Sequence, residues 1–326
     1  MTRGVNGAAA AAPPPRTTVP RALPILLLLG AAATVPLVLA TVFPPFGALA
    51  ILPTVALTLL LAGRFDRTGA DRPWLVPALL AGGLLLAIVS AATGVWNGVS
   101  DEPYATPAFA RAGLALYTRP VSFDYTQYGS VHHEFTYYVY LPLLTYLQVP
   151  GVDYRWLSIG AWVGSVLALR RDRYAASAVA MPWVALLAAN GQNDFVPLLA
   201  LSLALAPTRG RWAPVFEIIA LGLKQFANAI AIGAHLLRRE WRAALLASAV
   251  SLALLVPYLF VNAGAVYCRV LVANPSGGCS PASASFLLLK RNYWLYPTWI
   301  WAVFHRGLRQ RAARVLARLR GSPEPI

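Results

Sequence analysis

Residues 96–138 read WNGVSDEPYATPAFARAGLALYTRPVSFDYTQYGSVHHEFTYY, the one long polar segment between hydrophobic runs. Four of the chain's 12 acidic residues lie in it, namely Asp101, Glu102, Asp124 and Glu134. Two of its 4 histidines, His132 and His133, lie there too. Asp101 and Glu102 directly follow an apolar run, so we expect one of these carboxylates where lipid gives way to water, partly desolvated.

The composition predicts an all-α, polytopic membrane protein. Hydrophobic residues make up 58% of the 326 residues and charged residues only 12%, whereas soluble domains are about half apolar and a quarter charged. The formal net charge is +15, but the arginines cluster at the ends of apolar runs, where they orient spans in a bilayer. We therefore expect membrane lipids, and no nucleic acid, as partners.

A helix needs roughly 20 apolar residues to cross a bilayer, and the apolar runs can be measured against that length. About ten candidate spans result: 22–43, 45–63, 73–95, 137–149, 153–169, 174–190, 194–207, 212–236, 243–266 and 283–304. Residues 1–21, rich in Ala and Pro, are expected to be a disordered cytoplasmic leader. Residues 22–305 would form the transmembrane domain, and residues 306–326 a basic cytoplasmic tail.

The positive-inside rule orients these spans in the plasma membrane. Arginines follow the second span and fill the tail, so both belong in the cytoplasm and the 96–136 and 267–281 loops outside. Alternation of ten spans then puts Arg170 and Arg171 outside. Either residues 174–207 form a hairpin with its tip outward, while 137–149 and 212–236 do not each cross once, or these arginines face outward because they bind a phosphate.

Cys268 and Cys279 are the only cysteines and flank a loop with Asn, Pro and Gly. Their spacing allows a disulfide if the loop faces an oxidising compartment, and two free thiols are the alternative. Neither cysteine has a histidine nearby in the sequence, so no metal site is predicted.

Polar residues inside apolar runs need a partner or a function, because burying them in hydrocarbon is costly. Lys224 stands in IIALGLKQFANAIAIG. It is either paired structurally or in contact with an anionic ligand, and Glu217, two helical turns earlier, is hard for it to reach. A second polar island, AANGQNDF, contains Asn190, Gln192 and Asp194. A turn with capping residues accounts for it, Gln192 least well.

Several motifs in order resemble the polyprenol-phosphate-dependent GT-C glycosyltransferases, in particular the bacterial alpha-1,2-mannosyltransferases. An acidic residue in the first large external loop is followed by LYTRP, then Tyr140-Leu141-Pro142, Gly191-Gln192-Asn193 and an intramembrane Lys224. The match runs from about residue 75 to 245. Relatives usually have Tyr-Pro-Pro and Lys-Pro where this chain has Tyr140-Leu141-Pro142 and Lys224-Gln225.

The resemblance implies transfer of a sugar, mannose by analogy, from a polyprenyl-phosphate donor to a lipid or glycan acceptor outside the membrane. The catalytic base maps to Asp101, with Glu102 the next choice. A phosphate monoester leaves as a stable anion, so one base suffices and the anomeric centre inverts. No DxD motif is present, so we expect neither a metal nor another cofactor.

Fixed cations would stabilise the leaving phosphate, and other polar groups would hold donor or acceptor. The candidate binding residues are Lys224, Arg119, Arg170, Arg171, His132, His133, Glu134, Tyr140, Gln192 and Asn193. The two histidines fit a surface role equally well. Residues 104–117 mix apolar side chains with Arg111, which predicts a short interfacial helix over the site. A transporter or lipid-carrier flippase without chemistry is the rival interpretation, although the sequence shows no repeated halves.

Overall fold

The computed structural model describes residues 47–68, 74–93, 109–127, 130–138, 140–146, 154–191, 194–205, 210–271, 295–305 and 307. The predicted leader, the first predicted span at 22–43 and the predicted tail, apart from residue 307, lie outside these ranges. Within them the chain is mostly helical, which confirms the predicted helical class.

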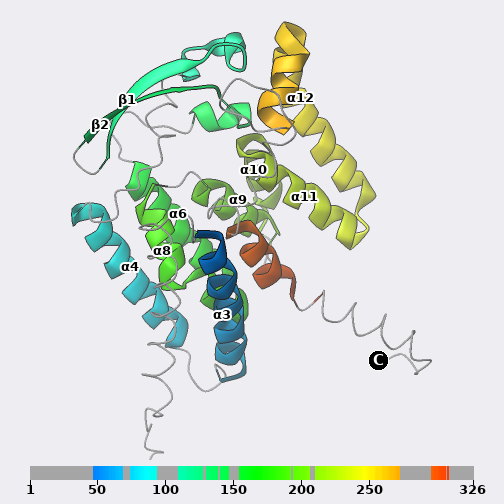
Figure 1. Cartoon of the computed structure of the whole chain (residues 1–326). Coiled ribbons are helices and arrows are strands. Elements are labelled where there is room, and N and C mark those ends of the chain that lie inside the picture. The colour runs from blue at the N-terminus through cyan, green and yellow to red at the C-terminus, as the bar shows by residue number, and fades with distance from the viewer. Residues whose placement is uncertain are drawn as a thin grey trace, which may run out of the picture.

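The described chain forms a helical bundle with a two-stranded hairpin at one end (Figure 1). The α-helices are α3 (Gly47–Thr68), α4 (Leu75–Thr93), α6 (Tyr154–Leu169), α7 (Arg173–Val179), α8 (Pro182–Ala189), α9 (Phe195–Leu205), α10 (Ala213–Leu223), α11 (Gln225–Arg238) and α12 (Trp241–Val266). Shorter elements are η3 (Gly113–Ala115), β1 (Val121–Gln127), β2 (Ser130–Thr136), η4 (Pro142–Tyr146) and the π-turn η5 (Tyr267–Leu271). A last helix covers residues 295–305.

Two helices of the described chain are long and apolar enough to cross a membrane, Leu75–Thr93 and Trp241–Val270. They correspond to the predicted spans 73–95 and 243–266. The prediction of about ten full spans is not supported. At 1.5 Å rise per residue, α9 and α10, with 11 residues each, are only about 16 Å long, about half the thickness of a bilayer's hydrocarbon core.

Three predicted spans take another form, and prolines or an extended residue explain why. The run 174–190 is divided into α7 and α8 because Pro182 starts a new helix at its first turn. Within the described part of the run 137–149, the helical element is the 3-10 helix η4, which begins at Pro142. The run 212–236 is divided at Lys224, whose backbone is extended (φ −144°, ψ 142°).

The helices α10 and α11 run antiparallel, with Lys224 at the apex between them. His235 of α11 pairs with Glu217 of α10, and closer to the apex Asn228 donates to the Leu221 carbonyl oxygen at 3.1 Å. The predicted span 212–236 is thus two antiparallel helices, and η4 packs against the first of them.

The bundle therefore has two chemically different ends. At the apex end lie Lys224, Asp194 and the hairpin. At the opposite end, which we call the arginine end, helix termini meet: Arg238 donates to the Leu205 carbonyl oxygen at 2.8 Å, and Tyr174 stacks on His305 with ring centroids 3.9 Å apart. Among the described residues, the exposed arginines of this end are Arg64, Arg170, Arg171, Arg173, Arg211, Arg239 and Arg242.

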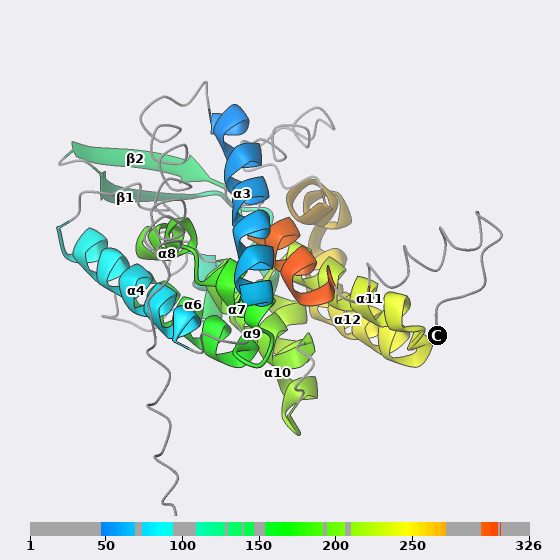
Figure 2. The ribbon, with the colours of Figure 1, turned by 90° about the horizontal axis from the view of Figure 1, so that it is seen from below.

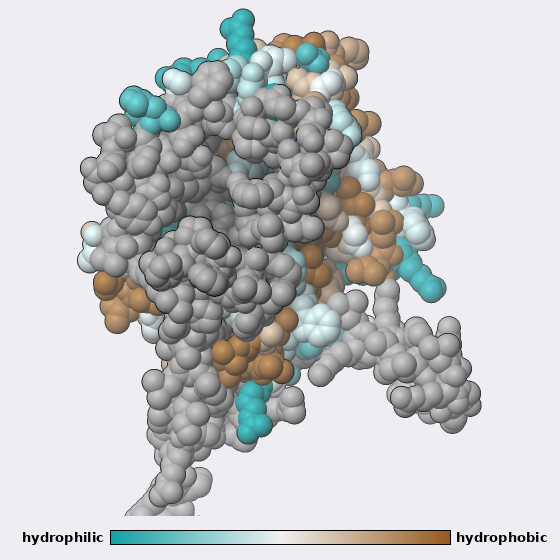
Figure 3. Space-filling model, viewed as in Figure 1, coloured by the Kyte–Doolittle hydropathy of each residue, from teal (hydrophilic) through white to brown (hydrophobic). Residues whose placement is uncertain are grey.

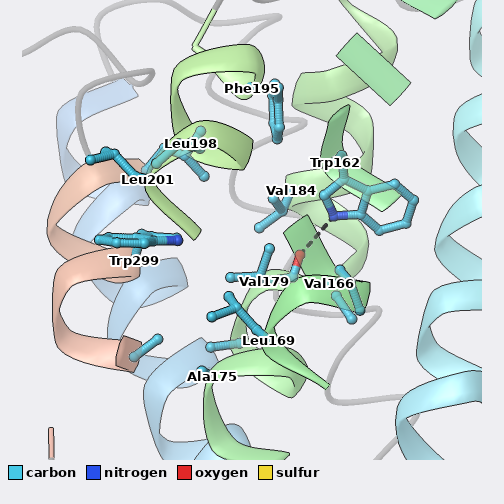
Figure 4. Packing of buried hydrophobic residues seen from close by; sticks show 14 of the residues in the cluster. Trp162, Val166, Leu169, Ala175, Val179, Val184, Phe195, Leu198, Leu201 and Trp299 are labelled. Atoms are coloured by element: carbon cyan, nitrogen blue, oxygen red, sulfur yellow. Dashed lines mark hydrogen bonds between the residues drawn. The ribbon is translucent and has the colours of Figure 1, made fainter. Parts of the chain in front are cut away.

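The main core surrounds α8, and small residues let its helices approach closely. Trp162 of α6 donates to the Val179 carbonyl oxygen at 2.7 Å, while Trp299 from the last helix packs on the other side of the cluster (Figure 4). A Cβ at Gly83 of α4 would lie 2.9 Å from the Trp162 ring. In the view from below, α4 flanks this core on one side and α11 and α12 on the other (Figure 2).

The outer helices leave apolar surface uncovered. Phe260 of α12 is 88% exposed and Leu85 of α4 is 66% exposed. Hydrophobic residues gather over α11 and α12 on the face seen in Figure 3. Such contiguous apolar surface marks a site of interaction with a membrane or a partner, which is consistent with the two long apolar helices.

The β-hairpin is a feature that the sequence analysis does not predict. Strand β1 pairs with β2 in antiparallel register, with Asp124 opposite His133, in a region expected to be a polar loop with short helices. A helical turn does precede it, at η3 within the predicted 104–117 helix. A second apolar cluster, which includes Phe109, Tyr138, Leu223 and Val266, joins this segment to α10 and α12.

Candidate functional site

The candidate site is built around Lys224, because the extended backbone at this apex turns its side chain into the protein. The ammonium group is 2.7 Å from Oδ1 of Asp194, and the two side chains are only 3% and 2% exposed. Asp194 precedes α9, and its backbone carbonyl accepts from the amide of Leu198 at 3.1 Å. The pair therefore ties the start of α9 to the α10–α11 apex.

A tyrosine from the last helix donates a further hydrogen bond to the carboxylate of this pair. Tyr296 donates its hydroxyl to the same Oδ1 atom of Asp194 at 2.8 Å, and its ring stacks on Phe226 of α11. A buried carboxylate needs several donors to offset its desolvation. Of the two alternatives for Lys224, the structural pair is therefore present, with Asp194 as the partner, while Glu217 pairs with His235 instead.

Tyr140, a predicted binding residue, does lie beside Lys224. The ammonium nitrogen is 4.6 Å from the centroid of the Tyr140 ring, a cation–π distance. The Tyr140 carbonyl oxygen accepts from the Tyr117 hydroxyl at 2.8 Å. Burial, with a smaller contribution from Tyr258, raises the pKa of Tyr117 far above its usual value, so this hydroxyl stays a donor.

An arginine that the sequence reasoning missed lies near these aromatics. Arg269, in η5, is buried, and its guanidinium carbon is 3.8 Å from the centroid of the Tyr137 ring. Cys268 beside it is disulfide-bonded, and Cys279, the other cysteine of the sequence, lies outside the described residues. The sequence signal that could have identified Arg269 is its position at the end of an apolar run, beside a cysteine of the candidate disulfide.

The other predicted residues of the external segment are less tightly placed. Arg119 is exposed after η3. His133 is exposed and pairs with Asp124 across the hairpin. His132 and Glu134 lie in β2, and their side chains are not among those described. Outside the described residues fall Asp101, Glu102, Gln192 and Asn193.

Arg170 and Arg171 lie at the other end of the bundle from Lys224 and do not share a site with it. They follow the last residue of α6, whereas Arg155 at its start donates to Ala91 near the apex end at 3.0 Å. The 16 residues of α6 separate the two ends by about 24 Å. Both arginines line a small pocket at the arginine end, together with Trp212.

The Lys224 cluster thus contains a buried ion pair whose two charges neutralise each other, with Tyr140 and Tyr296 in contact with it. Arg269 is a further buried cation near the hairpin. Among the described residues, no group of His, Cys, Asp and Glu is arranged to hold a metal ion. No family model, no curated protein and no solved structure matches this chain.

Proposed function

We propose that the chain is an integral membrane glycosyltransferase that moves a sugar, mannose by resemblance, from a polyprenyl-phosphate donor to a lipid or glycan acceptor on the external face, with inversion. One observation carries the proposal: the buried cluster of Lys224, Asp194 and Tyr140 lies at the end of the bundle to which the segment with Asp101 and Glu102 is attached at both sides.

The attachment points limit where the two carboxylates can lie. The segment leaves α4 after Thr93, close to the Ala91 carbonyl that binds Arg155. It returns at Phe109, which packs on Tyr138 with ring centroids 5.0 Å apart. Asp101 is about eight residues from either point, a reach of at most about 30 Å. Because both attachment points lie at the apex end, this tether supports a base that works near the Lys224 cluster.

Within this function, Lys224 is a positioning residue. Its charge is balanced by Asp194, so it offers little attraction to a departing phosphate, but it fixes the Tyr140 ring and the apex. Arg269 is the better candidate for the leaving phosphate, because its guanidinium is held against the Tyr137 ring near the hairpin and its planar fork of donors matches phosphate oxygens well. Asp101 or Glu102 would take the acceptor's proton.

The charge distribution supports an active site on the external face. Exposed arginines gather at the arginine end, which the positive-inside rule assigns to the cytoplasm. The apex end then faces outward, and the disulfide at Cys268 suits an oxidising compartment there.

The test is transfer of radiolabelled mannose from a polyprenyl-phosphate donor by the purified full-length chain. We expect Asp101→Asn, or failing that Glu102→Gln, to lower the rate by about 100-fold or more, as loss of a general base does, without altering insertion. Asp124→Asn, a carboxylate 62% exposed in the same external segment, is the matched control and should remain active.

Retention of activity in both the Asp101 and the Glu102 variants would remove the proposed base. Movement of the intact lipid-linked sugar across vesicles, with the glycosidic bond unbroken, would instead identify a carrier. A loss of rate in Arg269→Gln that Arg269→Lys partly restores would assign the phosphate contact to this side chain.

A further inference from the structure

A groove of about 860 Å³ runs between α10 and the first half of α12, away from the apex. Its walls are apolar: Ile218 and Leu221 come from α10, and Leu246, Ala247 and Val250 from α12. Leu246 is 67% exposed and Ile218 50% exposed. In the described chain, α12 is part of one of the two helices that are long and apolar enough to cross a membrane. If α12 crosses the membrane, the groove beside it opens toward the lipid acyl chains.

Two arginines and a tryptophan stand at one end of this groove. Arg239, Trp241 and Arg242 line it where α11 ends and α12 begins. Arg239 terminates α11 in a left-handed conformation (φ 63°), which reverses the chain there. Hydrophilic residues stand beside the apolar surface at this turn in Figure 3. Tryptophan and arginine at the edge of an apolar surface are typical of the lipid headgroup level.

Two carboxylates also line the groove, and one histidine is hydrogen-bonded to both of them. Buried His235 has its Nδ1 2.6 Å from Glu240 and its Nε2 bonded to Glu217. Both carboxylates are therefore already bonded within the protein. At this mouth Arg239 and Arg242 are both exposed, whereas Glu240 is 40% exposed and bonded to His235.

We propose that this groove binds one anionic membrane phospholipid, with an acyl chain along Ile218, Leu246 and Val250 and the phosphate against Arg239 and Arg242. The apolar walls fit the chain and the basic mouth fits the headgroup. The site is separate from the Lys224 cluster and does not depend on the proposed transferase activity.

The experiment places the full-length protein in bilayer discs that contain a phospholipid with a photoreactive group in mid-chain, either phosphatidylglycerol or phosphatidylcholine. Labelled positions are then mapped by peptide sequencing. We expect labelling of Leu246 and Val250 to favour phosphatidylglycerol. Phe260, 88% exposed farther along α12, reports ordinary surrounding lipid and should take both labels equally.

The double variant Arg239→Gln with Arg242→Gln should abolish the preference for phosphatidylglycerol at Leu246. Each arginine should account for about a fivefold preference, because a basic side chain near an anionic headgroup favours binding by about that factor. Arg173→Gln with Arg211→Gln removes two exposed arginines from the same end outside the groove, and should leave the preference unchanged. Equal labelling by the two lipids at Leu246, or crosslinks there to a segment of this chain such as 22–43 in place of lipid, would overturn the proposal.

Discussion

Two charged clusters lie along the same α10–α11 hairpin, and they differ in their access to water. At the apex, Lys224 and Asp194 are 3% and 2% exposed. Nearer the arginine end, His235 is 4% exposed, but its partners Glu217 and Glu240 are 18% and 40% exposed. Removing one member of an enclosed pair strands a charge, whereas a partly open cluster can admit water. The loss of unfolding free energy on substitution should therefore depend on how deeply the partners are buried rather than on the number of ion pairs.

The enclosed pair should give the largest effect. Asp194→Asn leaves the Lys224 ammonium buried without a counter-charge and weakens the bond from Tyr296. We expect a loss of about 3–5 kcal/mol in the free energy of unfolding, measured in mixed micelles of increasing denaturing detergent. The double variant Lys224→Met with Asp194→Leu removes both charges and should recover most of that loss. A single variant as stable as the double one would contradict this account.

The sequence indicates where the elements of this cluster lie but not how they pair. Lys224 is conspicuous because a lysine in an apolar run has to be explained, and Asp194 because it stands between two apolar runs. They are 30 positions apart in the sequence, and no periodic signal links one to the other. Glu217 is the only local partner to consider, and it belongs to His235. Pairing across helices depends on their directions, which become visible only in the fold.

Long apolar runs are the most predictable feature, because composition alone defines them. The helices at Leu75–Thr93 and Trp241–Val266 begin and end within two residues of the predicted spans. The hairpin escapes prediction although its signal is present. Residues 121–126 alternate apolar and polar side chains, and Tyr128-Gly129 separates them from a second run in which Val131 and Phe135 are the apolar residues. The many charged residues favour the prediction of a polar loop, although side chains that alternate with a period of two indicate a strand.

The partly open cluster should give an intermediate effect. His235→Leu removes both hydrogen bonds to Glu217 and Glu240, but the two carboxylates can hydrate at the groove. We expect a loss of about 1–3 kcal/mol, by the same unfolding measurement and smaller than for Asp194→Asn. Glu217→Gln, which keeps the shape and an acceptor, should cost less than His235→Leu. A loss equal to that of Asp194→Asn would mean that water does not reach these carboxylates.

The smallest effect should come from the hairpin, where the charged partners are largely hydrated. His133 and Asp124 are directly opposed and bonded, yet their side chains are 82% and 62% exposed. Exposed pairs contribute about 0–1 kcal/mol, because water and salt screen them and ordering two side chains costs entropy. We therefore expect His133→Ala to leave the unfolding midpoint nearly unchanged. The same substitution should also leave the proposed sugar transfer intact. A lower transfer rate at unchanged stability would thus separate a binding role of this histidine from a structural one, which the ion pair alone cannot do.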